Sequence, residues 1–190
     1  SKSLFKINKD NIITREPGGT KFSEKIRSFI VKNHEFVISS DTELLLIYAS
    51  RNDHVIKTIL PNLKNKNVIC DRFIYSTYCY QVNLENASKK IKFLHDNFAF
   101  NLMPTITFLL DIDPEKGIKR SLRVKKKETK FEKKDLKFHK LVRKNYLKLA
   151  EENEDILIIK GELPIRQIHS EIIDFINHRN YFKNKLPYSV

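Results

Sequence analysis

Two short polar segments of this sequence combine residue types that bind and transfer phosphate. The first is Thr14-Arg15-Glu16-Pro17-Gly18-Gly19-Thr20, and the second begins at Asp71-Arg72. A carboxylate at the tip of an apolar strand suits a Mg²⁺ that bridges phosphates, and the adjacent guanidinium can hold a phosphate through paired hydrogen bonds. Each segment alone also fits a plainer interpretation, a strand–helix connection or an exposed ion pair of little energetic worth. Together they indicate phosphoryl-transfer chemistry.

Apolar runs predict the strands that must position these segments. Four short runs are apolar throughout, at 11–14, 67–71, 105–111 and 156–160. Continuous apolar runs are typical of parallel strands covered on both faces, and open parallel sheets bind ligands at the carboxyl ends of their strands. Each polar segment comes at the end of a predicted strand, so we expect both at the carboxyl edge of the sheet.

Longer amphipathic stretches predict the helices between these strands. They span 42–60, limited by Pro61, and then 87–100, 133–153 and 164–180. Asp113-Pro114-Glu115 predicts another helix start, because an Asp cap, a proline in the first turn and an acidic side chain all favour a helix N-terminus. Strands alternating with helices indicate an α/β fold in three layers, α/β/α, with a central parallel sheet.

Composition agrees with a single globular domain. The chain has 190 residues, of which 41 % are hydrophobic, and no apolar run is long enough to span a bilayer. The first residues lack the apolar core of a signal peptide, so we expect a cytoplasmic protein with no membrane partner. Cys70 and Cys79 fit neither a disulfide framework nor a zinc pattern. We predict two buried thiols in a reducing compartment.

The strong positive charge raises the hypothesis of a nucleic-acid-binding protein. The formal net charge is +13, but the lysines are spread along the whole chain. No zinc-finger spacing, helix-turn-helix pattern or RNA-recognition motif accompanies them. A small phosphate-rich substrate uses the same sign of charge. We therefore predict no nucleic-acid partner.

Four motifs, in this order, resemble those of the bacterial thymidylate kinase family. They are TREPGGT at 14–20, ASR at 49–51, DRFIYSTYCYQ at 71–81 and TFLLDIDPE at 107–115. The resemblance covers essentially the whole chain, residues 131–150 included, as one nucleoside monophosphate kinase domain with the P-loop NTPase-type fold. It implies an enzyme, usually a homodimer, that transfers the γ-phosphate of ATP to dTMP with Mg²⁺. The products are dTDP and ADP, and the pathway is dTTP synthesis.

The resemblance implies roles for individual residues in the dTMP site. Glu16 and Pro17 line the pocket, and Arg51 faces the carbonyl edge of thymine. The remaining base and sugar contacts fall to Thr77, Gln81 and Tyr80, and a residue that stacks on thymine in the family is Ile47 here.

Other residues receive roles at the phosphates. The resemblance places Arg27 and Arg72 on the dTMP phosphate, and Asp71 near the metal, through water. A lid at about 119–133 follows, in which Arg120 and Arg123 face the ATP phosphates.

A cation of the lid would act as an arginine finger in cis, and the candidates are Arg123 and Lys130. The lysines at 125–127 fit an ordinary solvated face. Arg143 and Tyr146 belong to a VR-x-x-Y pattern of the family and are expected to support the pocket.

Several departures from the family keep alternatives open. The sequence contains no G-x-x-x-x-G-K-[ST] loop, and residues 1–7 resemble the tail of a helix. We expect a preceding strand, the ATP-binding loop and most of a first helix, about 20–30 residues by the size of such a unit. Ile47 replaces an aromatic residue, Lys130 replaces an arginine, and Gln81 runs directly into 82–84 without the family's glycine-rich stretch. A kinase with another acceptor and a catalytically inactive binding protein are the alternatives.

Overall fold

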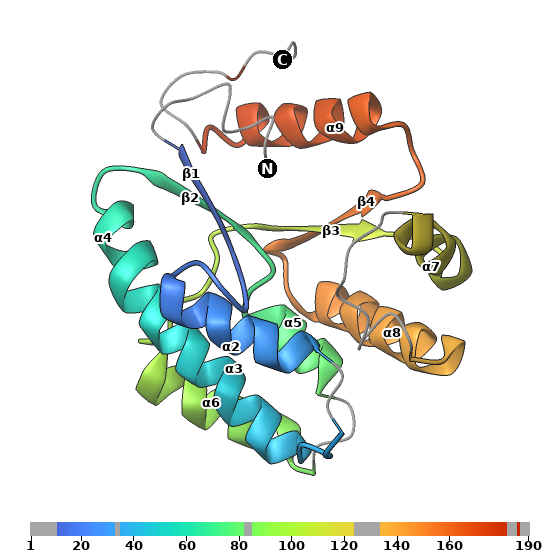
Figure 1. Ribbon diagram of the computed structural model, residues 1–190. Coiled ribbons are helices and arrows are strands. Elements are labelled where there is room, and N and C mark those ends of the chain that lie inside the picture. Colours follow the sequence, from blue (N-terminus) through green and yellow to red (C-terminus); the bar gives the residue numbers. More distant parts are fainter. Residues whose placement is uncertain (1–10, 33–34, 82–84, 124–133, 182–185, 187–190) are drawn as a thin grey trace.

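The computed structural model describes residues 11–32, 35–81, 85–123 and 134–181, together with Leu186. Within them, helices and strands alternate along the chain (Figure 1). The elements are β1 (Asn11–Arg15), α2 (Lys21–Val31), α3 (Ser40–His54), the π-helical turn η1 (Val55–Ile59), α4 (Leu60–Leu63), β2 (Asn67–Asp71), α5 (Ile74–Tyr80), α6 (Ala87–Phe98), β3 (Thr107–Asp111), α7 (Pro114–Arg123), α8 (Leu136–Glu152), β4 (Ile156–Lys160) and α9 (Ile165–His178).

The four strands form two parallel pairs. β1 pairs with β2 and β3 pairs with β4, while β2 and β3 share no ladder within the described ranges. All four predicted strands are confirmed, although β3 begins at Thr107 and not at 105. The parallel arrangement is confirmed as well. Within the described residues the parallel strands form two ladders of two strands each.

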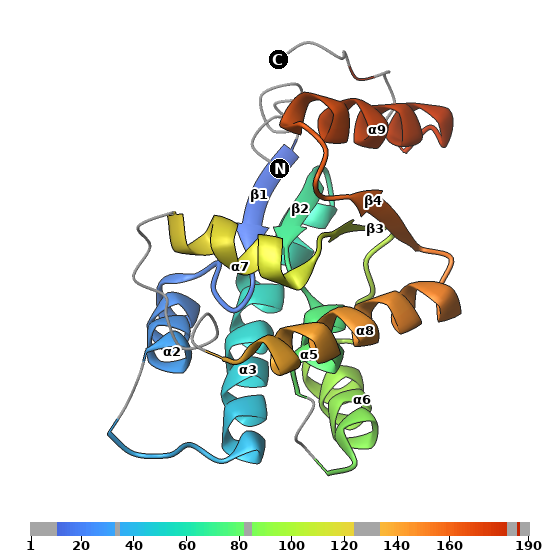
Figure 2. The same ribbon diagram turned by 90° about the vertical axis from the view of Figure 1, so that its right-hand side faces the viewer.

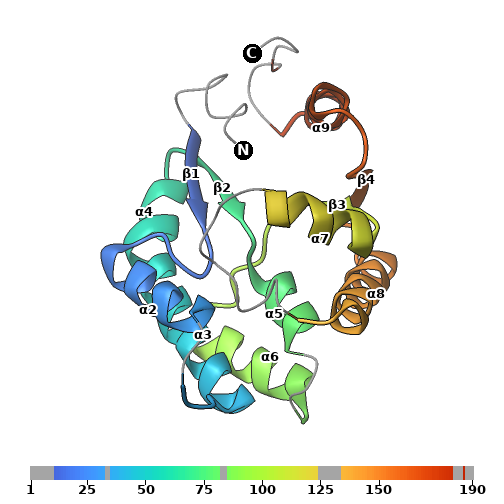
Figure 3. The same ribbon diagram turned by 45° about the vertical axis from the view of Figure 1, so that its right-hand side comes forward.

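Helices lie on both sides of the strands, as the three-layer prediction requires. Helix α9 lies on one side, and α2, α3, α5, α6 and α8 lie on the other (Figures 1, 2 and 3). Under α9, Ile173 and Ile176 pack against Ile69 of β2 and Phe108 of β3. The larger core lies on the opposite side, where buried side chains of α3, α5 and α6 meet Ile156 of β4. The two strand pairs are therefore joined through helices.

The strands are less covered than their apolar runs predict. Ile13, Leu110 and Ile158 are 37 %, 50 % and 50 % exposed. An unbroken apolar run indicates that both faces of a strand are suited to burial. It does not show how completely the described helices cover them.

The helix predicted at 42–60 consists of three segments. Helix α3 begins earlier, because Ser39 caps it by accepting a hydrogen bond from the Thr42 amide. The chain then widens into η1, where the Leu60 amide bonds to the Val55 carbonyl, five residues back. Pro61 was expected to limit the helix, and instead lies in the first turn of α4. A proline is tolerated at that position, because its missing N–H has no obligatory partner there.

Other boundaries shift by a few residues or were not predicted. Helix α8 begins at Leu136, because the Asp135 side chain caps it by accepting from the Phe138 amide. Helices α2 and α5 are additions to the predicted set. Cys79 is buried as expected, but Cys70 is half-buried, which corrects that part of the prediction. The helix tail predicted at 1–7 lies outside the described residues.

Candidate active site

Strand register brings the two polar segments together. Arg15, the last residue of β1, pairs with Asp71, the last residue of β2. The Glu16 amide then donates a hydrogen bond to the Asp71 carbonyl at 3.0 Å. Both segments thus leave the carboxyl ends of neighbouring parallel strands, which is where open α/β folds bind ligands. The placement predicted from the sequence is confirmed.

The turn after β1 is held in place by side chains of α2 and α3. Gly18 and Gly19 have φ angles of +137° and +90°, which favour glycine. The Ser50 hydroxyl accepts from the Gly18 amide at 3.3 Å, and the Arg27 Nη1 donates to the Pro17 carbonyl at 3.0 Å. Thr58 donates to the Gly19 carbonyl at 3.2 Å. This turn is anchored from two helices.

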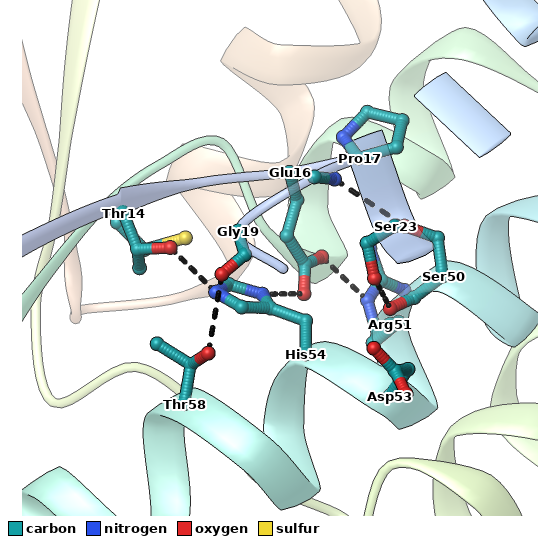
Figure 4. A network of polar contacts seen from close by, with 12 residues as sticks. Thr14, Glu16, Pro17, Gly19, Ser23, Ser50, Arg51, Asp53, His54 and Thr58 are labelled. Atoms are coloured by element: carbon teal, nitrogen blue, oxygen red, sulfur yellow. Dashed lines mark hydrogen bonds and ion pairs between the residues drawn. The ribbon is translucent and has the colours of Figure 1, made fainter. Parts of the chain in front are cut away.

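A buried ion pair lies directly behind the turn (Figure 4). The Arg51 Nε donates to the Glu16 Oε2 at 2.7 Å, and the two side chains are 1 % and 3 % exposed. The Arg51 Nη2 donates to the Thr77 hydroxyl at 2.9 Å. Its Nη1 is buried and has no hydrogen-bond partner among the described residues. A buried donor left in that state is costly, and therefore indicates a place for a ligand acceptor.

The surroundings of Arg51 keep it charged. Burial is the largest single influence on the pKa of this guanidinium and lowers it, but Glu16 and Tyr48 together outweigh burial, and the pKa of Arg51 is raised. The rings of Tyr48 and Phe73 lie 4.8 Å and 5.1 Å from the guanidinium carbon and favour the cation further. Burial also raises the pKa of Tyr48 to about 12, so its phenol stays protonated at neutral pH.

The second polar segment forms an aromatic wall beside the turn. Arg72 has a φ of +67°, an uncommon backbone conformation for a residue with a side chain. Its Nη2 donates to the Tyr80 hydroxyl at 3.1 Å, and its guanidinium carbon lies 4.9 Å from the centre of that ring. Tyr146 meets Tyr80 edge-on and bonds to Ser76 at 2.6 Å. The expected supporting role of Tyr146 agrees with this packing.

Gln81, Ile47 and Asp71 were also predicted for the dTMP site or the metal, and no described hydrogen bond joins their side chains to those of the buried ion pair. Gln81 is buried and donates to the Glu43 carboxylate at 3.3 Å. Ile47 is half-buried on α3, and Asp71 is exposed at the end of β2. No group of three or more His, Cys, Asp or Glu residues that could hold a metal occurs in the described part of the chain. To bind a metal ion, Asp71 would therefore have to share it with ligand oxygens from a nucleotide or from water.

Of the three lid candidates, the structure describes the side-chain contacts of Arg120 alone. The Arg120 Nη1 donates to the Gly161 carbonyl at 3.1 Å, beyond the end of β4. Arg123 is the last residue of α7, and Lys130 lies outside the described residues. Arg143 forms a bidentate ion pair with Asp111 at 2.6 Å and 2.7 Å. Arg143 therefore contacts the end of β3. Among the described residues, no hydrogen bond joins it to Glu16 or Arg51.

Sequence reasoning missed several residues that hold the site. His54 contacts both Thr14 and Glu16, Ser50 accepts from the amide of Gly18 in the turn, and Glu43 accepts from the predicted site residue Gln81. A signal for His54 was present, since it follows Arg51 by three residues and so shares its helix face. No comparable signal marks Glu43, whose partner Gln81 is 38 residues away.

Parallel strands between helical layers, with a charged site at their carboxyl ends, define an α/β protein of the nucleotide-binding type. The family model for thymidylate kinase matches residues 2–172. The chain therefore belongs to the thymidylate kinase family, whose members are nucleoside monophosphate kinases and phosphotransferases.

Individual relatives agree with this assignment. A thymidylate kinase from Onion yellows phytoplasma (strain OY-M) is 41 % identical over 165 residues, covering 85 % of this chain and 80 % of the relative. One from Acholeplasma laidlawii (strain PG-8A) is 38 % identical over 182 residues, covering 93 % and 89 %. The crystal structure of thymidylate kinase from Ehrlichia chaffeensis superposes with a TM-score of 0.70 at 29 % identity, covering 92 % of this chain and 86 % of the other.

Proposed function

We propose that this protein phosphorylates dTMP with ATP, giving dTDP and ADP for dTTP synthesis. The observation that carries this proposal is the buried Arg51, which Glu16 holds in place while one of its nitrogens has no partner among the described residues. Such a donor suits a carbonyl oxygen of a base. Membership of the thymidylate kinase family supports thymine as that base.

Selectivity would follow from how the pocket binds the base. Arg51 donates to the carbonyl edge of thymine, while Thr77 and Gln81 contribute hydrogen bonds near it and Ile47 packs on the ring. A base that presents a donor to Arg51 would leave buried groups unpaired, and sites built on hydrogen bonds discriminate strongly for that reason. Glu16, Pro17 and Tyr80 complete the pocket around the base and sugar.

The acceptor phosphate would lie between Arg27 and Arg72, both of which come from elements that meet at the turn. Asp71 fits a Mg²⁺ ion held through water, because Mg²⁺ commonly takes one or two carboxylates and completes its coordination with phosphate oxygens and water. The bound ion would supply charge neutralisation for the phosphates. Asp71 is the last residue of β2 and Arg72 follows it directly, so both leave the carboxyl end of this strand.

We further propose that lid cations contact the ATP phosphates. Arg120 and Arg123 would bind ATP, and Arg123 or Lys130 would stabilise the charge that develops during transfer. Replacing each by methionine separately would identify the catalytic cation, since its loss would lower kcat far more than it raises the KM for dTMP.

Location and assembly complete the proposal. In the described ranges, no helix has both the length and the apolar character needed to cross a membrane. That finding is compatible with the proposed cytoplasmic location. We also propose a homodimer, supported by exposed Phe22 and Phe29 on α2 and Leu45 on α3. Ultracentrifugation would test it, and a monomer at micromolar concentration would contradict it.

Calorimetric titration of this chain with dTMP, dUMP and dGMP tests the acceptor site. We expect dTMP to bind and dGMP not to bind, because a purine places different groups against Arg51. The matched variant Arg51→Met retains length but removes all donors, and should abolish dTMP binding while circular dichroism reports whether it folds. Equal affinity for dTMP and dGMP would contradict the proposed acceptor, and would favour a kinase with another substrate.

A further inference from the structure

A chain of hydrogen bonds continues from the ion pair to the interior of β1 (Figure 4). Glu16 binds Arg51 through Oε2 and His54 through Oε1, the latter at 3.0 Å from the His54 Nδ1. The Nε2 on the other side of the His54 ring lies 2.6 Å from the Thr14 hydroxyl. Both oxygens of one buried carboxylate are thus engaged by side chains of α3.

The partners of His54 determine where its proton lies. The Glu16 carboxylate only accepts, so the Nδ1 of His54 must carry a hydrogen and donate it. In the neutral imidazole, the Nε2 then accepts from the Thr14 hydroxyl, which can donate. This arrangement selects the Nδ1–H tautomer.

The ring of His54 is closely packed on the side that faces the turn. His54 is fully buried. Gly19 lies directly against the ring, because a Cβ built on this glycine would overlap the His54 Cδ2 and Nε2 atoms. The turn and the histidine are therefore packed against each other, and the absence of a side chain at Gly19 leaves room for the ring.

We propose that His54 is a positioning residue of the acceptor site, which holds Glu16 so that Arg51 keeps its Nη1 available for the base. This inference rests on the proposed function. Without His54, the Glu16 Oε1 would be buried without a donor, while Arg51 already bonds to the other oxygen of the same carboxylate. The carboxylate would then turn toward the guanidinium and engage the nitrogens that bind Thr77 and the ligand.

Two substitutions separate positioning from simple packing. The amide nitrogen of Asn can occupy the place of the Nδ1, so His54→Asn preserves the bond to Glu16, whereas His54→Ala removes it. We expect His54→Ala to weaken dTMP binding in calorimetry about tenfold or more, and His54→Asn to stay within about threefold of wild type. If His54→Ala does not fold, His54→Gln replaces it, because its longer amide reaches toward Thr14 and away from Glu16.

A second buried histidine provides the control. His95 is also buried, but its Nε2 bonds to the backbone carbonyl of Leu102 and not to Glu16. His95 packs edge-on against Tyr48 and Phe73, which flank Arg51, so His95→Ala should lower thermal stability and change the dTMP Kd by no more than His54→Asn does. If His54→Ala and His95→Ala lower stability alike and neither changes the Kd, the role of His54 is only structural and the inference is overturned.

The tautomer gives a readout that needs no ligand. Nitrogen-15 chemical shifts of the wild-type chain should show the Nδ1–H form of His54, and the Nε2–H form would overturn the inference whatever dTMP does. A wild-type chain that fails to bind dTMP contradicts the proposed function. In that case the tautomer still decides whether His54 holds Glu16.

Discussion

Two arginine–carboxylate pairs lie at the ends of the two strand pairs and differ in their access to water. Arg51 and Glu16 are 2.7 Å apart with side chains 1 % and 3 % exposed. Arg143 and Asp111 are 2.6 Å apart with side chains 41 % and 22 % exposed. The shortest N···O distances are nearly the same, although Arg143 bonds to its carboxylate through two nitrogens and Arg51 through one. Distance alone therefore does not distinguish their roles.

Exposure to water changes how much stability the protein loses when each pair is broken. A buried charge that loses its partner has no water to replace it, so removing one member is strongly destabilising even where the intact pair adds little stability. A half-exposed pair exchanges its partner for water at small cost. We infer that the β1–β2 end is a fixed site, whereas the charges at the β3–β4 end can rearrange cheaply.

The largest effect is expected from breaking the buried pair. Arg51→Met should lower the free energy of unfolding by about 3–5 kcal/mol, because it leaves Glu16 charged, buried and without its main partner. Urea denaturation measures this loss. The double variant Glu16→Gln with Arg51→Met also removes the unpaired carboxylate charge, and should therefore recover part of the lost unfolding free energy. A double variant less stable than Arg51→Met would contradict the interpretation.

Gly19→Ala should have the next largest effect. It combines an unfavourable φ of +90° with overlap against His54, and we expect a loss of about 3 kcal/mol in unfolding free energy. Gly117→Ala within α7 is the matched control, since the atom that its Cβ would meet among the described residues is the Ile112 Cγ2 at 3.4 Å. That change should stabilise by about 0.5–1 kcal/mol, as alanine favours helix. Equal effects at both sites would refute the proposed close packing of turn and histidine.

The exposed pair of Arg143 and Asp111 should contribute about 1 kcal/mol or less to the free energy of unfolding. Its hydrogen bonds from Arg143 lower the pKa of Asp111. A lowered folded-state pKa means that the contribution is present above the unfolded value of about 3.9 and disappears as pH falls through the folded value. Arg143→Ala should therefore reduce stability at pH 7 slightly and flatten its decline below about pH 5. An unchanged acid profile would show that the pair has no effect.

The smallest effect is expected for Lys116, which bonds to Glu162 at 2.6 Å on an exposed surface. Lys116→Met should leave the urea midpoint within experimental error, with or without added salt. A midpoint shift as large as that of Arg143→Ala would show that exposure is not what separates these pairs.

The contrast between the two regions also explains what the sequence could predict. The strands, their parallel direction and the meeting of Glu16 with Asp71 follow from local apolar runs and from the geometry of parallel sheets. The family motifs assigned Arg51 and Thr77 to the same site, and the structure brings the Arg51 Nη2 within 2.9 Å of the Thr77 hydroxyl. These features depend on short stretches of sequence that contain their own signal.

Features that depend on packing between distant segments were not predictable in this way. The left-handed backbone of Arg72 has no sequence signal, because glycine or asparagine would normally be expected there. The bond of His54 to Thr14 joins residues 40 positions apart. Likewise, Arg143 was assigned to the pocket because of its motif, but its partner is Asp111. Only the folded arrangement determines such partners.

The π-helical turn at η1 has a consequence for how this helix could evolve. Its hydrogen bond spans five residues where an α-helix spans four, so the turn contains one residue more than the regular repeat requires. Because the bulge absorbs that residue, deleting one residue within Val55–Ile59 would restore the regular repeat and leave the helix beyond it in phase with Arg51 and His54. The same deletion would remove or displace Thr58, whose hydroxyl bonds to the Gly19 carbonyl. The extra residue thus adds a contact to the turn without changing the direction of the helix that leads on to β2.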